Sequence, residues 1–313
     1  MDGLTDILAA LAIALRRFAV ARKLIARLEA RGSDPSLVGV LWETMGMVEL
    51  YVGKQSDGVR SLRRGMLACR REPRPTTHGT DEKSAEEEAE SASTRKRIAL
   101  RLAGHYKLVG RFDEAIGLLD ELLQEPRSTV EPLLLAASCY HATGDLPKAR
   151  QLCQEALSLD NRCGPAYFRL CDVALDLGQT HDAIAYAESG LDQDPGNAAG
   201  HALLALSHLA AGNLADAVLC ATKATQRSQE NKLAYLVAAD ALRRLGESEE
   251  ALDWLAQVQS RWPKEAKVEY QRALCYLDLG RPDKVEESIR TLADLPGTGD
   301  LVSDIHRLLD EQP

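Results

Sequence analysis

Histidine and cysteine are the side chains of this chain that most often bind metals or act as nucleophiles, and their spacing decides whether they do so. The 313 residues include seven of each, and no two cysteines have the CxxC spacing of a metal or redox site. His201 and His208 share a helix face but lie seven residues apart, too far to hold one metal ion without further ligands. Cys163 and Cys171 flank a proline-initiated helix, with no further histidine or cysteine to complete a zinc site. The sequence therefore predicts no metal site.

Motifs for catalysis and cofactor binding are also absent from the sequence. It contains no GxxxxGK(S/T) or GxGxxG loop to cradle phosphates, no HExxH metal-binding helix and no GxSxG nucleophile turn. We therefore expect no catalytic residues, no cofactor-binding residues and no enzymatic activity.

The charge balance argues against nucleic acid as a partner. The formal net charge is −9 at pH 7, and residues 95–313 alone carry −9, whereas residues 1–72 carry +4. A helical repeat protein that reads RNA needs a basic groove to hold the phosphates. The short arginine and lysine clusters lie mostly in the N-terminal part, so we expect protein partners and no nucleic acid.

Apolar runs and cysteine usage indicate a compartment. No apolar run reaches the ~18 residues needed to span a bilayer, so no membrane insertion is expected. The apolar run Ile7–Leu15 follows Asp2 and Asp6 and precedes Arg16 and Arg17, the reverse of the charge order of a secretory signal. The scattered cysteines fall largely on apolar helical positions, as reduced core thiols do. These features predict a cytoplasmic, reducing, intracellular environment.

The chain is organised by a glycine that returns every 34 residues. Each glycine stands in a short polar turn between two apolar segments, as in LVGRFDEAI and AAGNLADAV. Such a fixed period indicates stacked helical repeats, and glycine suits the left-handed conformation that ends a helix. The turn glycines are Gly110, Gly144, Gly178, Gly212, Gly246 and Gly280.

Small side chains stand at two further fixed positions in each repeat, where they would let two helices pack closely on either side of the turn. Seven residues before the glycines stand Ala103, Ala137, Cys171, Ala205, Ala239 and Ala273. Five residues after them stand Ala115, Ala149, Ala183, Ala217, Ala251 and Val285.

At these residues the chain resembles the tetratricopeptide repeat (TPR) family of 34-residue helix–turn–helix units. The large residue four before the glycine fits at Tyr106, Tyr140 and Tyr276, whereas Ala174, His208 and Leu242 depart from the pattern. An earlier repeat matches with Gly53 as its turn glycine, and with Trp42 and Gly46 eleven and seven residues before it.

The resemblance implies an all-α fold, a right-handed α-solenoid (superhelix) of about eight helix pairs plus a C-terminal capping helix. Residues 1–72 are expected to hold N-terminal repeats, the first of which is divergent and lacks its turn glycine. Residues 95–299 would hold six regular repeats. Residues 300–313 would form the capping helix, with one apolar face made of Leu301, Ile305, Leu308 and Leu309.

Residues 73–94 interrupt the repeats, because the interval from Gly53 to Gly110 exceeds one repeat by 23 residues. The segment carries a charge of −4 and almost no large apolar residues, so it predicts an acidic disordered insertion, or at most a weak helix. Whether this insertion docks on the basic face of Arg60, Arg63 and Arg64 or remains a solvated linker stays open.

In the TPR family the first helix of each repeat lines a concave groove, which here corresponds to positions ten, six and three before each turn glycine. Eleven of these eighteen positions are apolar, which favours an amphipathic helix or an extended apolar peptide as ligand. The alternative is that some of these side chains pack against a neighbouring repeat. The predicted groove residues are Leu100, Leu134, Ser138, His141, Phe168, Asp172, Leu206, Leu236, Asp240, Arg243, Tyr270 and Leu274.

The resemblance implies a non-catalytic protein–protein interaction scaffold or adaptor. The alternatives are a dedicated chaperone for a subunit of a larger assembly or secretion apparatus, and a non-catalytic subunit of an enzyme complex. Self-association also stays open. The branch of the family that grips acidic chaperone tails uses paired asparagines and lysines, and the matching positions here hold no asparagine, which disfavours that role. The remaining candidates for contacting a carboxylate are Arg97, Arg101 and Arg169.

Overall fold

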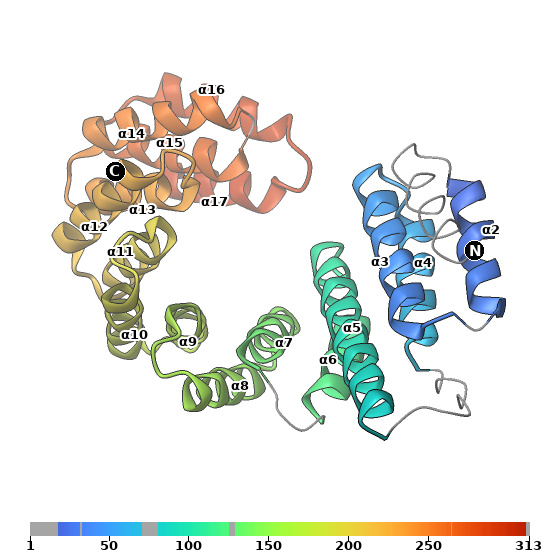
Figure 1. The fold of residues 1–313 in the computed structure, drawn as a ribbon. Helices are drawn as coiled ribbons and strands as arrows, with labels where there is room; N and C mark the ends of the chain where they lie inside the picture. Colours follow the sequence, from blue (N-terminus) through green and yellow to red (C-terminus); the bar gives the residue numbers. More distant parts are fainter. Residues whose placement is uncertain (1–17, 32, 71–80, 125–128, 264, 311–313) are drawn as a thin grey trace. The chain divides into compact units, whose positions relative to one another are not determined.

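The computed structural model describes residues 18–31, 33–70, 81–124, 129–263 and 265–310, and these residues form sixteen α-helices (Figure 1). The apolar run Ile7–Leu15, residues 73–80 of the acidic segment and the last three residues lie outside this part. The chain divides into two compact units, residues 1–149 and 150–313. None of the helices in the described ranges is long and apolar enough to cross a bilayer.

The first unit is a sequence of helices in which each packs against the next. α2 packs on α3, α3 pairs with α4, and α5 contacts both members of that pair. α6 then pairs with α5, and α7 contacts both α5 and α6. The helices are α2 (Phe18–Arg31), α3 (Pro35–Tyr51), α4 (Gln55–Ala68), α5 (Asp81–Leu108), α6 (Phe112–Leu123) and α7 (Val130–Ala142).

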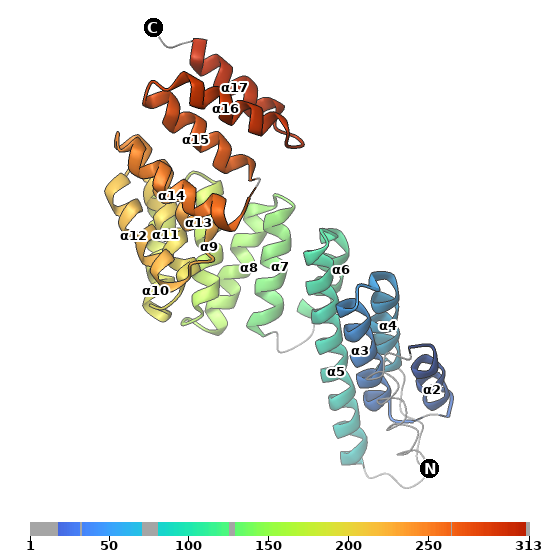
Figure 2. The same ribbon diagram turned by 90° about the horizontal axis from the view of Figure 1, so that it is seen from above.

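The second unit repeats one arrangement along its length, as seen in Figure 2. Each first helix of a pair contacts its own second helix and the first helix of the next pair, and α17 packs on both α15 and α16. α8 (Leu146–Leu159) spans the division between the units. The later helices are α9 (Gly164–Asp176), α10 (Thr180–Gln193), α11 (Ala198–Ala211), α12 (Leu214–Arg227), α13 (Lys232–Arg244), α14 (Ser248–Arg261), α15 (Ala266–Asp278), α16 (Pro282–Ala293) and α17 (Gly299–Asp310). The predicted all-α architecture of sequential helix pairs is confirmed.

The turn glycines end the first helices as predicted. All seven, from Gly53 to Gly280, have positive φ values between 62° and 87°. After each glycine the next backbone N–H reaches back to the carbonyl four residues before the glycine, as in Asn213 N to His208 O at 2.9 Å. This closing hydrogen bond satisfies a carbonyl that the helix end leaves open, and a side chain at the glycine would strain it.

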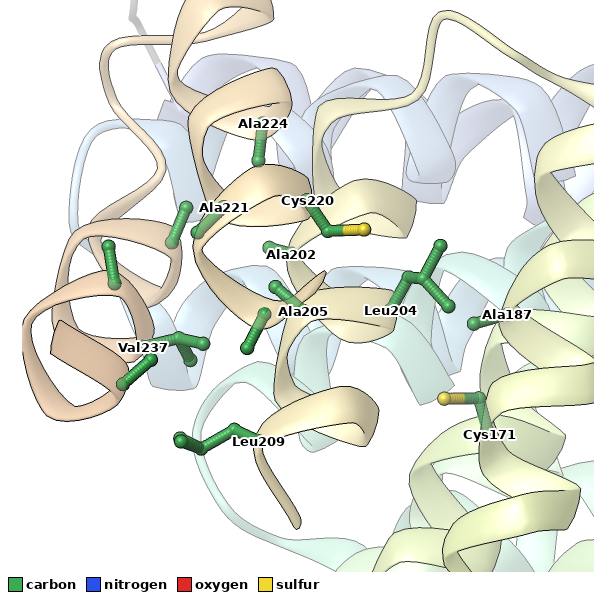
Figure 3. Packing of buried hydrophobic residues seen from close by; sticks show 14 of the residues in the cluster. Cys171, Ala187, Ala202, Leu204, Ala205, Leu209, Cys220, Ala221, Ala224 and Val237 are labelled. Carbon is green, nitrogen blue, oxygen red and sulfur yellow. The ribbon is translucent and has the colours of Figure 1, made fainter. Parts of the chain in front are cut away.

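The small residues predicted on either side of the turns lie in the contacts between helices. Ala115, Ala149, Ala183, Ala217, Ala251 and Val285 are all fully buried. In one core cluster of the second unit, alanines of α11 and α12 pack together with Cys171, Cys220 and Val237 (Figure 3). Alanine-sized side chains leave little room between helix backbones, so the helices of this unit pack at close range.

The α3–α4 pair depends on glycine in both helices. A β-carbon at Gly58 would lie 2.6 Å from Leu50 Cγ and 2.8 Å from the Gly46 carbonyl oxygen. A β-carbon at Gly46 would lie 2.9 Å from the Gly58 carbonyl oxygen. The two backbones therefore approach too closely for any larger residue at either position.

Two buried carboxylates hold the helices of the first unit together. Glu43 of α3 accepts a hydrogen bond from Arg97 at 2.8 Å and forms an ion pair with Arg101 at 2.7 Å, and both arginines lie on α5. Glu49 of α3 accepts from Arg22 of α2 at 2.5 Å and from the Ser61 hydroxyl of α4 at 2.6 Å. The hydrogen bonds to Glu43 raise the pKa of Arg97. Because a buried charge without a partner is costly, Arg97 and Arg101 are engaged within the fold rather than free to contact a partner's carboxylate.

Of the two alternatives considered for the acidic segment, disorder or a weak helix, residues 81–94 adopt helix, because α5 already begins at Asp81. Near residue 91 the helix packs through small polar side chains: the Ser91 hydroxyl donates to the Cys69 carbonyl at 2.9 Å, and Thr94 lies 3.2 Å from Ser36. Glutamate and alanine favour helix, and carboxylates near its N-terminus interact well with the helix dipole. Contacts of this kind need no large apolar residues, whose absence was the basis for the predicted disorder.

The glycine contacts predict opposite effects for two glycine-to-alanine substitutions within helices. Gly58→Ala should destabilise the α3–α4 pair by about 1–3 kcal/mol, because its methyl group overlaps Leu50 and the Gly46 carbonyl. Gly104→Ala in α5 meets nothing within 4 Å and should stabilise its helix by up to ~1 kcal/mol. Hydrogen exchange resolved by segment measures both effects locally, which suits a repeat protein that opens in parts. Equal effects of the two substitutions would contradict the close approach.

Candidate functional site

A hollow in the second unit gathers apolar side chains from the first helices of three successive pairs. It has a volume of about 420 Å³ and is lined by residues of α11, α13 and α15. We call it the leucine hollow, because leucine is its commonest residue. Its lining comprises Leu206, Leu209, Leu233, Leu236, Val237, Asp240, Arg243, Arg244, Lys267, Tyr270, Gln271 and Leu274.

A second hollow of about 390 Å³ adjoins it and shares the helices α11 and α13. It is lined by residues of α9, of the start of α11 and of the start of α13, including Phe168, Arg169, Asp172 and Leu203. Leu233 lines both hollows and is 37 % exposed. We call this second one the phenylalanine hollow. A single ligand that covers Leu233 would touch both.

The repeat places the lining residues at the same positions in successive helices. Positions ten and six before the turn glycine supply Leu236 and Asp240 from α13, and Tyr270 and Leu274 from α15. Because helical residues three and four apart share a face, these positions point the same way in each repeat. The hollows are therefore a consequence of the repeat itself.

Charged groups surround the apolar floor of the leucine hollow. Arg243 pairs with Asp240 at 3.4 Å and with Asp278 at 3.2 Å, and Arg244 pairs with Asp240 at 2.8 Å. Lys267 is exposed and makes no ion pair with any residue that the structure describes. The arginines are thus held in place by acidic neighbours, while the lysine ammonium stays available to solvent or to a ligand.

Two buried polar atoms at the leucine hollow lack a hydrogen-bond partner among the described residues. They are Arg243 Nε, a donor, and Gln271 Oε1, an acceptor. The amide nitrogen of Gln271 is engaged with the Leu236 carbonyl at 3.3 Å. Buried polar groups are nearly always satisfied in folded proteins, so an unsatisfied donor and acceptor in one hollow mark a place where further polar groups fit.

Tyr270 connects the leucine hollow to the last helix. Its hydroxyl donates a hydrogen bond to Asp304 of α17, which also pairs with Arg307. Burial, together with this hydrogen bond to Asp304, raises the pKa of Tyr270 to about 12. The hydrogen bonds from Tyr270 and Arg307 lower the pKa of Asp304. The last helix is therefore held by a residue that also lines the hollow.

The Phe168 side chain contributes mainly to packing between helices and less to the open surface of the phenylalanine hollow. β-Carbons at Gly190 of α10 and Gly200 of α11 would each lie 2.5 Å from its ring. The ring occupies space that these two glycines leave, which is the packing alternative considered for the groove residues. A substitution that removes the Phe168 ring would therefore disturb the packing of α9, α10 and α11, so its effect on ligand binding could not be separated from its effect on the fold.

The structure brings six of the twelve predicted groove residues into one hollow: Leu206, Leu236, Asp240, Arg243, Tyr270 and Leu274. Phe168 and Asp172 line the adjacent one. The remaining four lie in the first unit, on α5 and α7; Leu100, Leu134 and His141 are half-buried there and Ser138 is buried. That these residues bind a partner remains a prediction.

The sequence analysis missed lining residues at other positions of the same helix face. Leu233 and Lys267 stand thirteen residues before their turn glycines, and Val237 and Gln271 nine before. Extending the face by one helical turn toward the N-terminus would have found Leu233 and Lys267, and widening it by one residue beside position ten would have found Val237 and Gln271.

Histidine and cysteine form no reactive cluster in the part of the chain that the structure describes, where no three His, Cys, Asp or Glu side chains are placed to hold a metal. One His201 ring nitrogen lies 3.2 Å from the Pro195 carbonyl oxygen, and burial lowers the pKa of this histidine. His208 lies 3.4 Å from the side-chain amide of Asn213. All seven cysteines are free and buried.

Comparison with known families agrees with this repeat architecture. Two family models described as tetratricopeptide repeat match the sequence, one at residues 108–173 and 140–206 and the other at 203–266 and 236–293. The chain belongs to the tetratricopeptide repeat family. TPR proteins are usually non-catalytic and generally bind other proteins, and the family matches include no catalytic domain. A comparison with curated proteins found no match.

Several solved structures share the fold at low sequence identity. A tetratricopeptide repeat protein from Parabacteroides merdae is 13 % identical with a TM-score of 0.64, covering 87 % of this chain and 99 % of its own. PilF of Pseudomonas aeruginosa is 14 % identical with a TM-score of 0.58, covering 68 % and 96 %. A thermophilic TPR protein of Thermus thermophilus is 20 % identical with a TM-score of 0.51, covering 58 % and 99 %. At these identities the likeness shows the fold alone.

The buried thiols should be unreactive in the folded TPR protein. Burial raises the pKa of Cys153 and Cys275 to about 12 and that of Cys171 to about 11. Only the thiolate is nucleophilic, so a disulfide reagent at pH 8 should label these thiols slowly in buffer and rapidly in denaturant. Because the folded pKa values are raised, the stability that these thiols contribute is fully present below about pH 8.5, the unfolded pKa, and is lost as the pH rises through 11–12. Fast labelling in buffer would contradict the burial.

The contact between Tyr270 and Asp304 predicts a specific weakening of the last helix. Tyr270→Phe removes the hydroxyl, and amide exchange in α17 should become a few-fold faster while α15 stays folded. The folded pKa of Asp304 is lowered, so its contribution is present above about pH 3.9 and is lost as the pH falls through the folded value. Tyr276→Phe on the same helix is the control, since its hydroxyl contacts Arg272 rather than α17. Equal effects of the two substitutions would rule out this contact as the reason.

Proposed function

We propose that this TPR protein is a non-catalytic interaction scaffold or adaptor that binds an apolar peptide or amphipathic helix of a partner in the second unit. The observation that carries the proposal is the leucine hollow, in which five leucines and Tyr270 converge from three consecutive helix pairs. Apolar side chains gathered in a hollow with a few polar groups at its edge are typical of a ligand site. The proposed site continues into the phenylalanine hollow.

The energetics of the leucine hollow favour an apolar ligand side chain. Burying one large aliphatic side chain contributes about 1.5–3 kcal/mol, and several such contacts are needed to exceed the cost of association. The unsatisfied pair Arg243 Nε and Gln271 Oε1 complements the carbonyl and N–H of a peptide unit, after a rotation of the two side chains. These groups would orient a peptide that the leucines hold.

The free thiols support a reducing compartment for this function. Seven buried cysteines without a disulfide are expected of a protein that folds in the cytoplasm, where thiols stay reduced. We therefore place the scaffold in the cytoplasm, with one or more proteins as partners and no cofactor.

A charge placed at Leu233 tests the proposal. This residue lines both hollows and is the second residue of α13, where a carboxylate suits the helix dipole, so Leu233→Glu should leave the fold intact. Partners of the wild-type protein should bind the Leu233→Glu variant at least about tenfold more weakly, because one apolar contact is lost and a charge is buried in the complex. Quantitative affinity purification beside the wild type measures the loss, with circular dichroism as the check on folding.

The matched control is Leu219→Glu on α12. Leu219 is 54 % exposed and lines neither hollow, so the same chemical change there should leave partner binding unaltered. Partners that persist with Leu233→Glu, or that vanish equally with both variants, would show that the hollows are not the binding site.

A further inference from the structure

A basic surface on α2 and α4 stands out in a chain whose net charge is −9. α2 carries four basic residues and one acidic residue, and α4 carries three basic residues and one acidic residue. The two helices are linked by ion pairs, Arg22 to Asp57 at 3.1 Å and Arg64 to Glu29 at 3.2 Å. These pairs use both acidic residues of the two helices.

Three cations of α2 are left over. Lys23, Arg27 and Arg31 are all exposed and make no ion pair with any residue in the described ranges. They are spaced by four residues, so they lie along one face of the helix, and we call them the basic stripe. Like charges at this spacing repel one another, so the stripe destabilises the isolated helix. An acidic partner along the stripe would turn that repulsion into attraction.

Exposed aliphatic side chains accompany the basic groups. Val20 is 48 % exposed and stands three residues before Lys23 on the same helix face. Leu67 of α4 is 60 % exposed and stands three residues after Arg64. The aromatic residue of these two helices, Phe18, is buried, so neither helix offers a ring for stacking a nucleic-acid base.

We propose that the basic stripe, with Val20, is a second interaction surface that binds an acidic polypeptide segment containing aliphatic residues. Carboxylates of the segment would pair with Lys23, Arg27 and Arg31, and an aliphatic side chain of the segment would cover Val20. Charge complementarity selects an acidic partner, and the aliphatic contact together with the lack of exposed rings on these two helices selects polypeptide over nucleic acid. This surface does not depend on the function proposed for the hollows.

A charge-reversal pair with a matched control tests the proposal on the full chain. The probe is a short fluorescent peptide of glutamate and leucine, followed by fluorescence anisotropy. Lys23→Glu/Arg27→Glu should weaken its binding about tenfold or more, and added salt should weaken binding to the wild type. The control is Lys223→Glu/Arg227→Glu on α12, which changes the same two residue types at the same spacing on an equally exposed helix face. The control and Leu233→Glu should both bind the probe like the wild type.

Four outcomes would overturn the proposal. The first is unchanged affinity of Lys23→Glu/Arg27→Glu for the probe, and the second is an equal loss of affinity with the control pair on α12. The third is equal affinity of the wild type for a peptide in which serine replaces leucine. The fourth is tighter binding of an oligonucleotide or an anionic vesicle than of the probe. Melting curves of both variants keep the test valid, because the substituted residues are exposed and make no ion pair within the described ranges, so stability should stay unchanged.

Discussion

The close approach of paired helices is the constraint on which the rest of the structure depends. Each pair turns at a glycine with positive φ, and alanine-sized residues on both sides let the backbones come together. In the α3–α4 pair the approach is closer still and requires glycine on both helices. A repeat built in this way buries little large apolar surface per pair, so its stability rests on many small contacts with neighbouring repeats rather than on one large core. In the first unit, ion pairs between buried carboxylates and arginines add further contacts between the helices.

The same constraint explains why the hollows exist. Small residues fill the contacts between helices, so the larger side chains ten and six positions before the glycines are left at the edge of the core. There they are half-buried, as Leu206, Leu236 and Leu274 are. A leucine in this state keeps apolar surface that only a ligand or a neighbouring element can cover. The close packing inside each repeat thus leaves exposed the apolar surface that we propose as the binding site.

Periodicity made much of the fold and part of the candidate site predictable, whereas single tertiary contacts were missed. The 34-residue spacing predicted the helix pairs and the turn glycines, and the resemblance to the TPR family implied the helix face from which six predicted residues line one hollow. It did not show that Phe168 fills the space above Gly190 and Gly200, that Tyr270 bonds to the last helix, or that Arg97 and Arg101 are engaged by Glu43. Nor did it place the start of α5 at Asp81, since Ser91 and Thr94 pack by hydrogen bonds. Each of these contacts joins residues from different elements, so no local sequence pattern predicts it.

The two proposed surfaces would affect different rates: the leucine hollow mainly dissociation, and the basic stripe mainly association. The leucine hollow offers desolvation of apolar side chains, which governs how long a complex lasts and changes little with salt. The basic stripe offers exposed charge, which is screened by salt and acts mainly on the rate of encounter. A chain with net charge −9 repels acidic proteins at long range, so an acidic partner meets attraction only where cations outnumber anions, as they do on α2 and α4. The same charge asymmetry that would recruit such a segment to α2 would therefore keep it away from the acidic repeats.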